Sequence, residues 1–401
     1  MTVDVGPPER ARTAEAALTL SEEMYKCVHC GLCLDVCPSY DVLGLETESS
    51  RGRIAFMKLV REGRLPLNPR VASHWESCFQ CLACQEVCPS AVAVGELMPQ
   101  ARALVVEHVG VPKELQEVFE STSRYGNPLG QSPRRRTAWT RGLAVSVPEL
   151  SRDGGAVDVL LFVGCYPSYH PRVQEVARAL VEILGRLGVN FGITREERCA
   201  GDSQRLAGEA GLFEYLAEQN MEAFGRLQFG ELLVIDPHEY NALKNEYPRF
   251  GLSQKVSHYS EFLARSLDVL KEQLVNPLDT TVTYHDPCYL GRKNKVYEEP
   301  RQLLRAIPGV NLVEMPRNRA NSFCCGGGAG GMWLDVEAAQ HYSERLSERR
   351  LDEAVRVGAR VLAVACPYDL LRFEDAVKTR GLEGKLVIKD ILELLAGALK
   401  K

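Results

Sequence analysis

Eight of the fourteen cysteines in the sequence repeat one spacing twice. Each run reads C-x2-C-x2-C-x3-C-P, so a triplet of evenly spaced cysteines is followed by a fourth that stands next to a proline. The runs are Cys27, Cys30, Cys33 and Cys37 before Pro38, and Cys78, Cys81, Cys84 and Cys88 before Pro89. Three closely spaced thiolates can wrap one iron–sulfur cube, while the proline redirects the chain. The spacing therefore predicts two 4Fe-4S clusters.

The fourth cysteine of each run is expected to reach the other cluster, as in two-cluster bacterial ferredoxins. The first cluster is then assigned to Cys27, Cys30, Cys33 and Cys88, and the second to Cys78, Cys81, Cys84 and Cys37. Structural zinc and a disulfide framework are the alternatives, because C-x2-C pairs also occur in zinc sites. Zinc sites usually take their ligands as two separated pairs, however, and this pattern is a triplet with an offset fourth cysteine.

Four more cysteines follow predicted strands near the C-terminus, namely Cys288, Cys324, Cys325 and Cys366. Four soft ligands are enough for one cluster, and Asp369 stands where a fifth ligand could sit. The glycines within 326–331 leave the backbone free to wrap closely around a cofactor. A four-thiolate zinc site and free buried cysteines are the alternatives. His285 is a candidate acid or base if this centre is itself catalytic, although such a histidine more often packs or bonds to the cluster.

The elements that must position these cysteines alternate between strands and helices, in an order that occurs twice. In the first half, strands at 157–163, 189–193 and 232–235 lead to Cys165, Cys199 and Asp236. In the second half, strands at 282–284, 310–313 and 361–365 lead to Cys288, Cys324 and Cys366. This alternation predicts parallel sheets covered on both faces, with sites at the carboxyl ends of the strands. Cysteines that are distant in the chain should therefore converge at one end of a sheet.

The first half keeps only two of the thiols, Cys165 and Cys199. Ala200, Asp236 and Glu239 stand at the other equivalent positions. This loss favours a scaffold without metal. A mixed zinc site built from Cys165, Cys199, Asp236, His238 and Glu239 is the alternative.

The predicted fold class is α/β with an α-helical ferredoxin module. We expect a helix-rich two-cluster domain over 1–120, a linker over 121–156, a first repeat over 157–275 and a second repeat over 276–401. A lead-in helix is predicted over 14–26, just before the first cysteine run. The linker is rich in turn residues, and its basic run Arg134–Arg136 is interpreted as solvated.

This order of a ferredoxin module and two repeats of C…CCG…CPxC resembles the heterodisulfide-reductase-like iron–sulfur proteins. That family includes the iron–sulfur component of glycolate oxidase and the D-type subunits of heterodisulfide reductases, which are electron-transfer proteins. The motifs that carry the resemblance are Cys27-Val28-His29-Cys30-Gly31 with Arg51-Gly52-Arg53, His285-Asp286-Pro287-Cys288-Tyr289-Leu290-Gly291, and Asn321-Ser322-Phe323-Cys324-Cys325-Gly326-Gly327-Gly328. They are spread over nearly the whole chain.

The resemblance implies that the complete repeat, with Cys288, Cys324, Cys325 and Cys366, holds a 4Fe-4S-type centre, which is non-cubane in the heterodisulfide reductases. Asp369 replaces the family's last cysteine, so a five-thiolate centre does not carry over. The first repeat departs further from the pattern, and no cluster is expected there.

Composition and charge limit the kinds of partner, location and cofactor that the protein can have. The net charge is −5 and the basic residues are spread along the chain, which argues against a nucleic-acid partner. No signal-peptide core and no apolar window of transmembrane length are found. We therefore expect a cytoplasmic location, peripheral to the inner membrane only through a partner. No dinucleotide or phosphate-binding loop has the right flanks, so flavin and nicotinamide should be bound by partners.

The leading hypothesis is an iron–sulfur electron-transfer subunit of a multi-subunit oxidoreductase, similar to a heterodisulfide reductase or a 2-hydroxy acid dehydrogenase or oxidase. Its expected partners are a flavoprotein, a ferredoxin, or both. The flavoprotein would be an FAD-binding oxidase subunit, a protein like the A-type subunit of heterodisulfide reductases, or an electron-transfer flavoprotein. Two alternatives stay open. The CCG centre could itself reduce a thiol or disulfide, or it could hold structural zinc and leave only the ferredoxin module redox-active.

Overall fold

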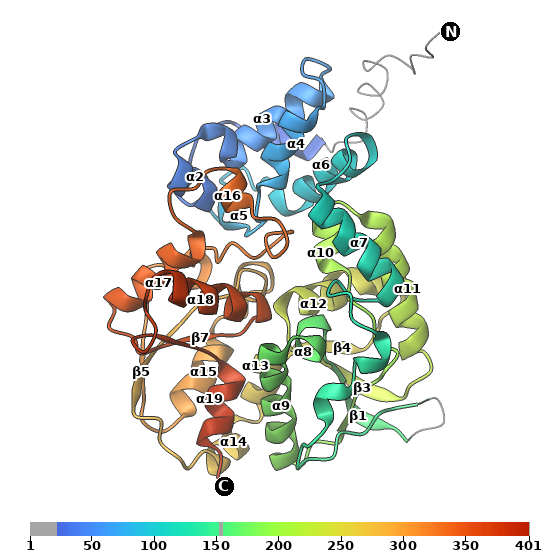
Figure 1. The fold of residues 1–401 in the computed structure, drawn as a ribbon, viewed down its shortest axis with the longest axis vertical. Coiled ribbons are helices and arrows are strands. Elements are labelled where there is room, and N and C mark those ends of the chain that lie inside the picture. The colour runs from blue at the N-terminus through green and yellow to red at the C-terminus, as the bar shows by residue number, and fades with distance from the viewer. Residues whose placement is uncertain (1–21, 152–154, 401) are drawn as a thin grey trace. The chain divides into compact units, whose positions relative to one another are not determined.

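The computed structural model describes residues 22–151 and 155–400 (Figure 1). The chain divides into two compact units, which are considered separately. The first comprises Met1–Gln116, Ser203–Ala210 and Gly326–Leu346, and the second comprises Glu117–Asp202, Gly211–Cys325 and Ser347–Lys401. The predicted domain bounds give the segments 203–210 and 326–346 to the two repeats, whereas both belong to the first unit. No sequence pattern signals this assignment.

The first unit is helical in its described residues. Its helices are the 3-10 helices η1 (Glu22–Lys26) and η2 (Glu46–Glu48), and the α-helices α2 (Pro38–Leu43), α3 (Ser50–Arg61), α4 (Pro69–Glu76), α5 (Ala83–Glu86), α6 (Val94–His108) and α16 (Val336–Ala339). Helix α7 (Lys113–Tyr125) begins in this unit and ends in the next. The predicted lead-in helix over 14–26 corresponds to η1 only at its end, and residues 14–21 lie outside the described residues.

Helix α3 forms the centre of the first unit. Ile54, Met57 and Val60 share one face at helical spacing and are buried in a core that also contains Trp75. Ser49 caps the helix by accepting a hydrogen bond from the Gly52 N–H group at 3.1 Å. A Cβ atom at position 52 would lie 2.1 Å from the carbonyl oxygen of Glu46, so only glycine fits there. The helix is therefore fixed in place at its first turn.

The second unit contains two parallel sheets of four strands among its described residues. The strand order is β2-β1-β3-β4 in one and β6-β5-β7-β8 in the other. The strands are β1 (Val157–Phe162), β2 (Phe191–Gly192), β3 (Phe229–Val234), β4 (Lys255–His258), β5 (Thr280–Tyr284), β6 (Val310–Val313), β7 (Val361–Val364) and β8 (Val387–Asp390). All pairings between neighbouring strands are parallel. The predicted fold class is confirmed.

Helices connect the strands in both repeats. In the first they are α8 (Cys165–Tyr169), α9 (Pro171–Arg186), α11 (Ala210–Phe224), α12 (Pro237–Asn241), the π-helix η5 (Ala242–Glu246), the 3-10 helix η6 (Tyr247–Phe250), α13 (Tyr259–Arg265) and α14 (Leu267–Gln273). In the second they are the π-helix η7 (Tyr289–Lys293), α15 (Glu298–Ala306), the 3-10 helix η8 (Arg319–Asn321), α17 (Leu346–Arg356), α18 (Pro367–Thr379) and α19 (Ile391–Ala398). Helix α10 (Asp202–Leu206) crosses from the second unit into the first.

The internal repeat extends to a fourth strand that the sequence analysis did not predict. Strand β4 leads into α13, and β8 leads into α19, with a capping box at the start of each helix. The two repeats contact each other through these elements and through α9 and α19, which lie side by side (Figure 1). The Tyr259 hydroxyl donates to Asp390 Oδ1 at 3.0 Å, and Arg172 on α9 pairs with Glu393 on α19 at 2.8 Å.

The predicted linker is folded rather than solvated around its basic run. It contains the end of α7 and two 3-10 helices, η3 (Pro133–Arg135) and η4 (Ala138–Thr140). Arg136 is only 2% exposed and forms an ion pair with the buried Glu197, while Trp139 is 1% exposed. The interpretation of Arg134–Arg136 as solvated is therefore wrong for Arg136. A short basic run carries no signal that one of its members has a buried acidic partner.

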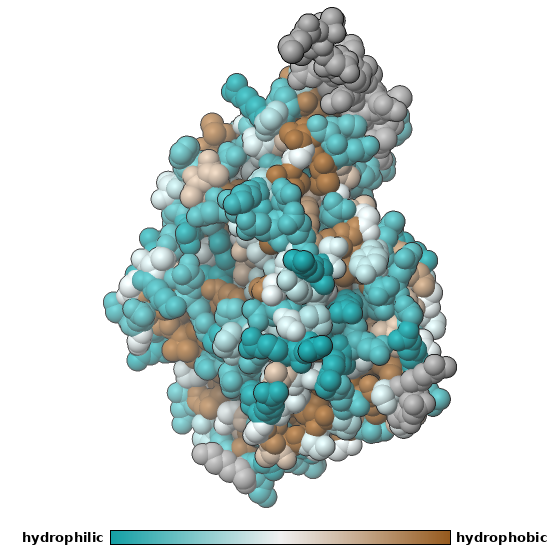
Figure 2. All heavy atoms as spheres, turned by 45° about the vertical axis from the view of Figure 1, so that its right-hand side comes forward, coloured by the Kyte–Doolittle hydropathy of each residue, from teal (hydrophilic) through white to brown (hydrophobic). Residues whose placement is uncertain are grey.

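Hydrophilic side chains cover much of the face in Figure 2, with hydrophobic ones gathered in smaller groups. Within the described residues, no helix has both the length and the apolar character needed to cross a bilayer.

The buried carboxyl group of Asp390 predicts a dependence of stability on pH. Burial raises its pKa to about 8, against 3.8 for an exposed group. The folded state therefore binds one proton more than the unfolded state between these values. The free energy of unfolding should fall as the pH rises through this range, by about 1.4 kcal/mol per pH unit for this group. Asp390→Asn stays neutral in both states and should remove this contribution.

Unfolding midpoints of the wild type and Asp390→Asn, measured at about pH 6 and about pH 7.5, check this expectation. The wild type should lose more stability than the variant over this interval. An equal loss in both proteins would contradict a raised pKa at Asp390.

Candidate iron–sulfur sites

The first cysteine run lines a cavity in the first unit. Its walls include Cys27, Cys30, Cys33 and Cys88, which are the four ligands assigned to the first cluster. Cys30 is exposed and the other three are half-buried. Cys84 lines this cavity as well, and the four assigned thiols match the donor set of a 4Fe-4S cluster. This cavity therefore fits the group that the sequence predicts.

A second cavity is lined by the other set, Cys37, Cys78, Cys81 and Cys84. Cys37 and Cys81 are buried, so this cavity is the more enclosed of the two. Ser50, Cys84 and Val94 line both cavities, which places the two cavities side by side. The grouping of Cys88 with the first run and of Cys37 with the second is the crossed arrangement that the sequence assignment requires.

Two arginines of α3 hold the backbone around the two cavities. The half-buried Arg51 donates from Nη1 to the carbonyl oxygen of His29, within the first cysteine loop, at 3.0 Å. Arg53 is 1% exposed and donates to the carbonyl oxygen of His74 at 2.6 Å and to Glu48 at 2.9 Å. Gly52 between them lets α3 pack against η2. The Arg-Gly-Arg motif thus directs one guanidinium group to the first cysteine loop and the other to α4 and η2.

Arg102 on α6 is a third arginine at these loops, and it is 3% exposed. Its guanidinium donates to backbone carbonyl oxygens of three chain segments. It reaches Cys78 at 2.5 Å, Leu206 at 3.1 Å and Ala329 at 2.6 Å, in addition to Trp75 and Glu76. The segments 203–210 and 326–346 therefore attach to the loop of the second cavity through one side chain. Gln80 in the same loop also donates to Leu206, at 2.6 Å.

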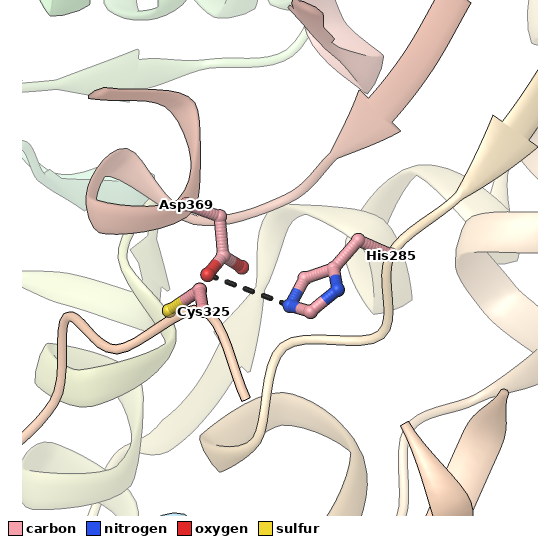
Figure 3. Close-up of side chains that lie close together, drawn as sticks. All are labelled: His285, Cys325 and Asp369. Carbon is pink, nitrogen blue, oxygen red and sulfur yellow. Dashed lines mark ion pairs between the residues drawn. The ribbon is translucent and has the colours of Figure 1, made fainter. Parts of the chain in front are cut away.

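In the second unit, the carboxyl ends of β5 and β7 bring His285 and Asp369 together with Cys325 (Figure 3). Each of the three is at most 6% exposed, and their ligand atoms lie within 4.8 Å of one another. In the described residues, this is the one set of histidine, cysteine and acidic side chains whose ligand atoms lie this close. Cys288, Cys324 and Cys366 are outside that limit. Cys324 and Cys366 are also buried, whereas Cys288 is half-buried.

Hydrogen bonds orient His285 within this group. Arg350 Nε donates to His285 Nδ1 at 3.1 Å, so the remaining ring proton is on Nε2. That nitrogen faces Asp369 Oδ1 at 3.6 Å, while Asp369 Oδ2 is buried and has no hydrogen-bond partner among the described residues. A buried carboxylate oxygen without a hydrogen-bond partner destabilises the folded protein unless it binds another group. The donor set therefore fits a metal or cluster that includes oxygen coordination.

Comparison with known proteins agrees with both kinds of site. The family described as "4Fe-4S dicluster domain" matches residues 23–92, and the family described as "Cysteine-rich domain" matches residues 159–243 and 282–371. The chain is 36% identical over 326 residues to the probable iron-sulfur-binding oxidoreductase FadF of Bacillus subtilis, a match that covers 80% of this chain and 46% of that protein. It is 32% identical over 419 residues to the EtfAB:quinone oxidoreductase of Syntrophomonas wolfei, a match that covers 94% and 58%.

Full-length similarity comes from a third relative. The D-type subunit of the dihydromethanophenazine:CoB–CoM heterodisulfide reductase of Methanosarcina mazei is 30% identical over 404 residues, and the match covers 94% of each chain. The chain belongs to the family of heterodisulfide reductase D-type subunits. It spans about half the length of the first two relatives.

Membership of the D-type family, together with the dicluster match, confirms 4Fe-4S clusters as the cofactor class. Burial raises the pKa of Cys78 and raises that of Cys84 well above its usual value. Arg53 and Arg102 oppose this effect at Cys78. Thiols of this kind keep their protons until metal binds, so cluster insertion must release protons.

Sequence reasoning on this D-type chain missed three functional features of the sites. It did not identify Arg102 or Arg350, because arginines that donate to distant groups leave no periodic pattern. It also left His285 without a partner, whereas the structure joins it to Asp369. The Arg51-Gly52-Arg53 motif was recognised, but its role in holding the first cysteine loop, α4 and η2 is visible only in three dimensions.

The charge on Arg102 should raise the reduction potential of the cluster in the second cavity. Arg102→Met removes a buried positive charge beside Cys78, so that potential should fall by an amount on the order of 50 mV. The cluster in the first cavity should keep its potential. Arg102→Lys keeps the charge and is the matched control. Redox titration followed by low-temperature EPR measures both clusters, and equal shifts in the two would argue against a local effect of Arg102.

Proposed function

We propose that this chain is the iron–sulfur electron-transfer subunit of a multi-subunit oxidoreductase. It relays electrons between a flavoprotein or ferredoxin partner and an acceptor. The observation that carries this proposal is the pair of adjacent cavities, which share Cys84 and between them contain all eight cysteines in the crossed grouping. When bound, 4Fe-4S clusters carry one electron at a time. The shared residue Cys84 keeps the two sites close enough for electrons to pass between them.

The ligand assignment is part of the proposal. We assign the first cluster to the cavity with Cys27, Cys30, Cys33 and Cys88, and the second to the cavity with Cys37, Cys78, Cys81 and Cys84. We assign the third centre to Cys288, Cys324, Cys325 and Cys366, with Asp369 as an oxygen ligand beside Cys325. The orphaned Asp369 Oδ2 atom supports this last role. The predicted residue bounds of the domains are likewise kept as a proposal.

A flavoprotein is the partner class that we favour. The chain has no dinucleotide-binding loop with the right flanks, and one relative is named an EtfAB:quinone oxidoreductase. The clusters of this protein would then accept electrons one at a time from a flavin that carries two. Contact with a membrane would come through a partner.

Structural zinc at the CCG site is the second candidate, and one observation favours it. The ligand atoms of Cys325 and Asp369 lie within 4.8 Å of each other and offer sulfur and oxygen donors, a mixture that zinc accepts. In that case, only the ferredoxin module would carry electrons.

Metal content separates the two candidates. Anaerobically purified protein should contain about 12 iron per chain and no zinc, and the double variant Cys324→Ser/Cys325→Ser should lose about four iron. Cys199→Ser is the matched control, because it removes a buried thiol outside the assigned sites and should keep all the iron. Iron, sulfide and zinc analysis with low-temperature EPR makes the measurement. About eight iron plus about one zinc, with only zinc lost in the double variant, would refute the third cluster.

The loop of the first cavity should be the docking point for the one-electron partner. Cys30 is exposed, and the neighbouring Val28 and Leu32 are 68% and 53% exposed. Apolar side chains this exposed beside a redox site indicate a protein contact. Val28→Glu should slow reduction by a reduced bacterial ferredoxin by about tenfold without changing iron content. Val269→Glu, at a similarly exposed valine of the second unit, is the control.

Stopped-flow absorbance at several ferredoxin concentrations gives the second-order rate constants. If Val28→Glu and Val269→Glu have the same effect, the docking point is elsewhere.

A further inference from the structure

Two of the fourteen cysteines have no assigned cluster, and both are in the first repeat. Cys165 follows β1 at the start of α8, and Cys199 follows β2. They are 3% and 7% exposed and pack together in one small cluster with Leu216. A hydrogen bond joins the two thiols. The backbone N–H group of Gly201 also points at Cys199 Sγ, at 3.5 Å.

A buried guanidinium group stands beside this pair. Arg136 Nη2 donates to Cys165 Sγ at 3.6 Å, and its Nη1 atom forms an ion pair with Glu197. Glu197 in turn accepts the N–H groups of Val163 and Gly164 at 2.8 and 2.9 Å. This network holds one fixed positive charge against one sulfur. Arginine cannot lose its proton in a protein, so the charge is permanent.

This charge argues against a metal ion between the two cysteines, because a cation already occupies one side of Cys165. The other donors of a mixed zinc site are also engaged. His238 Nδ1 pairs with Asp202 at 3.0 Å, and Asp236 caps α12 by accepting the N–H group of His238 at 2.7 Å. Within the described part of the chain, no three metal-ligating side chains of the first repeat come within 4.8 Å of one another.

The two thiols differ in acidity in the way that a thiol-exchange pair requires. Burial raises the pKa of Cys165, but the Cys199 thiol and Arg136 outweigh it and lower the pKa overall. The bond to Cys165 and burial raise the pKa of Cys199 well above its usual value. The attacking thiol of an exchange pair needs thiolate character, whereas its partner stays protonated until the second step.

Glu239 supplies the group that exchanges a proton with the thiol pair. Its Oε1 atom accepts the N–H group of Cys165 at 3.2 Å, which places the carboxyl group at the pair. Its Oε2 atom is buried and has no hydrogen-bond partner among the described residues. Burial and the nearby charges of Asp236 and Cys165 raise the pKa of Glu239 well above its usual value, so this carboxyl group carries a proton that it can give up and take back.

We propose that Cys165 and Cys199 form a redox-active dithiol, which a small-molecule disulfide oxidises to an intramolecular disulfide. The Cys165 thiolate attacks one sulfur of the small disulfide, forms a mixed disulfide with it and expels the first thiolate, which takes the proton of Glu239. Cys199 then gives its proton to Glu239 and attacks Cys165 Sγ, forming the protein disulfide and expelling the second thiolate. The protein loses two electrons and the small disulfide gains them. The couple adds a two-electron site to a chain whose clusters carry single electrons.

The test equilibrates the cluster-loaded full chain anaerobically in mixtures of reduced and oxidised dithiothreitol. Burial makes exchange slow, so equilibration runs over hours. Samples are quenched in acid, alkylated while unfolded and mapped as peptides. In the oxidising mixtures, we expect a peptide that links Cys165 to Cys199, while the EPR signals of the clusters stay unchanged. In the reducing mixtures, both cysteines should be alkylated. Mapping identifies the two residues directly, so the result does not depend on the cluster assignment.

Cys165→Ser and Cys199→Ser should each lose the linked peptide and leave the other cysteine alkylated in every mixture. The wild-type titration decides the question even if a variant fails to fold. Complete alkylation of both cysteines in the most oxidising mixture would overturn the proposal. Stoichiometric zinc that disappears in Cys165→Ser would also overturn it.

Discussion

Arginines that donate to backbone carbonyls are the interaction on which the metal-binding part of this protein depends. The cysteine loops contain little regular helix or strand, so many of their carbonyl oxygens have no partner from secondary structure. Buried carbonyls need donors, and a guanidinium group offers five in a fixed plane. Arg51 donates to the carbonyl oxygen of His29 and Arg102 to that of Cys78, and both side chains place positive charge near the cysteines. The same side chains therefore fix the loops and favour the charged form of their ligands.

Much of the architecture could be predicted from the sequence because it depends on local patterns. The alternation of apolar strands with helices was enough to predict two parallel-sheet repeats, and cysteine spacing was enough to propose two crossed clusters. The cavities group the cysteines in the same sets, although the ligand assignment stays a proposal. The edge strands β4 and β8 were missed, because each is only partly buried and runs directly into a helix, which leaves no separate apolar segment in the sequence. The role of Arg102 could not be predicted, because two of its acceptors are carbonyl groups more than a hundred residues away.

The two repeats share a fold but use the carboxyl ends of their strands differently. The second keeps its thiols and adds an acid, Asp369, beside Cys325. The first has lost most of its thiols and has instead gained a buried ion pair, Arg136 with Glu197. A permanent cation next to Cys165 takes the electrostatic place that a metal would otherwise have. Divergence of the repeats thus changed the charge balance of one site while leaving the sheet topology intact.

The crossed grouping of Cys37 and Cys88 also has a consequence for chain entropy. Under the proposed assignment, each metal centre joins the segment before the helical insertion to the segment after it, so the insertion becomes a loop tied at both ends. Such ties act as cross-links that restrict the unfolded chain, and metal binding then contributes to folding free energy. The cost of closing a loop rises only with the logarithm of its length. The insertion with α2, α3 and α4 can therefore change in length among relatives at little cost to the two sites that it connects.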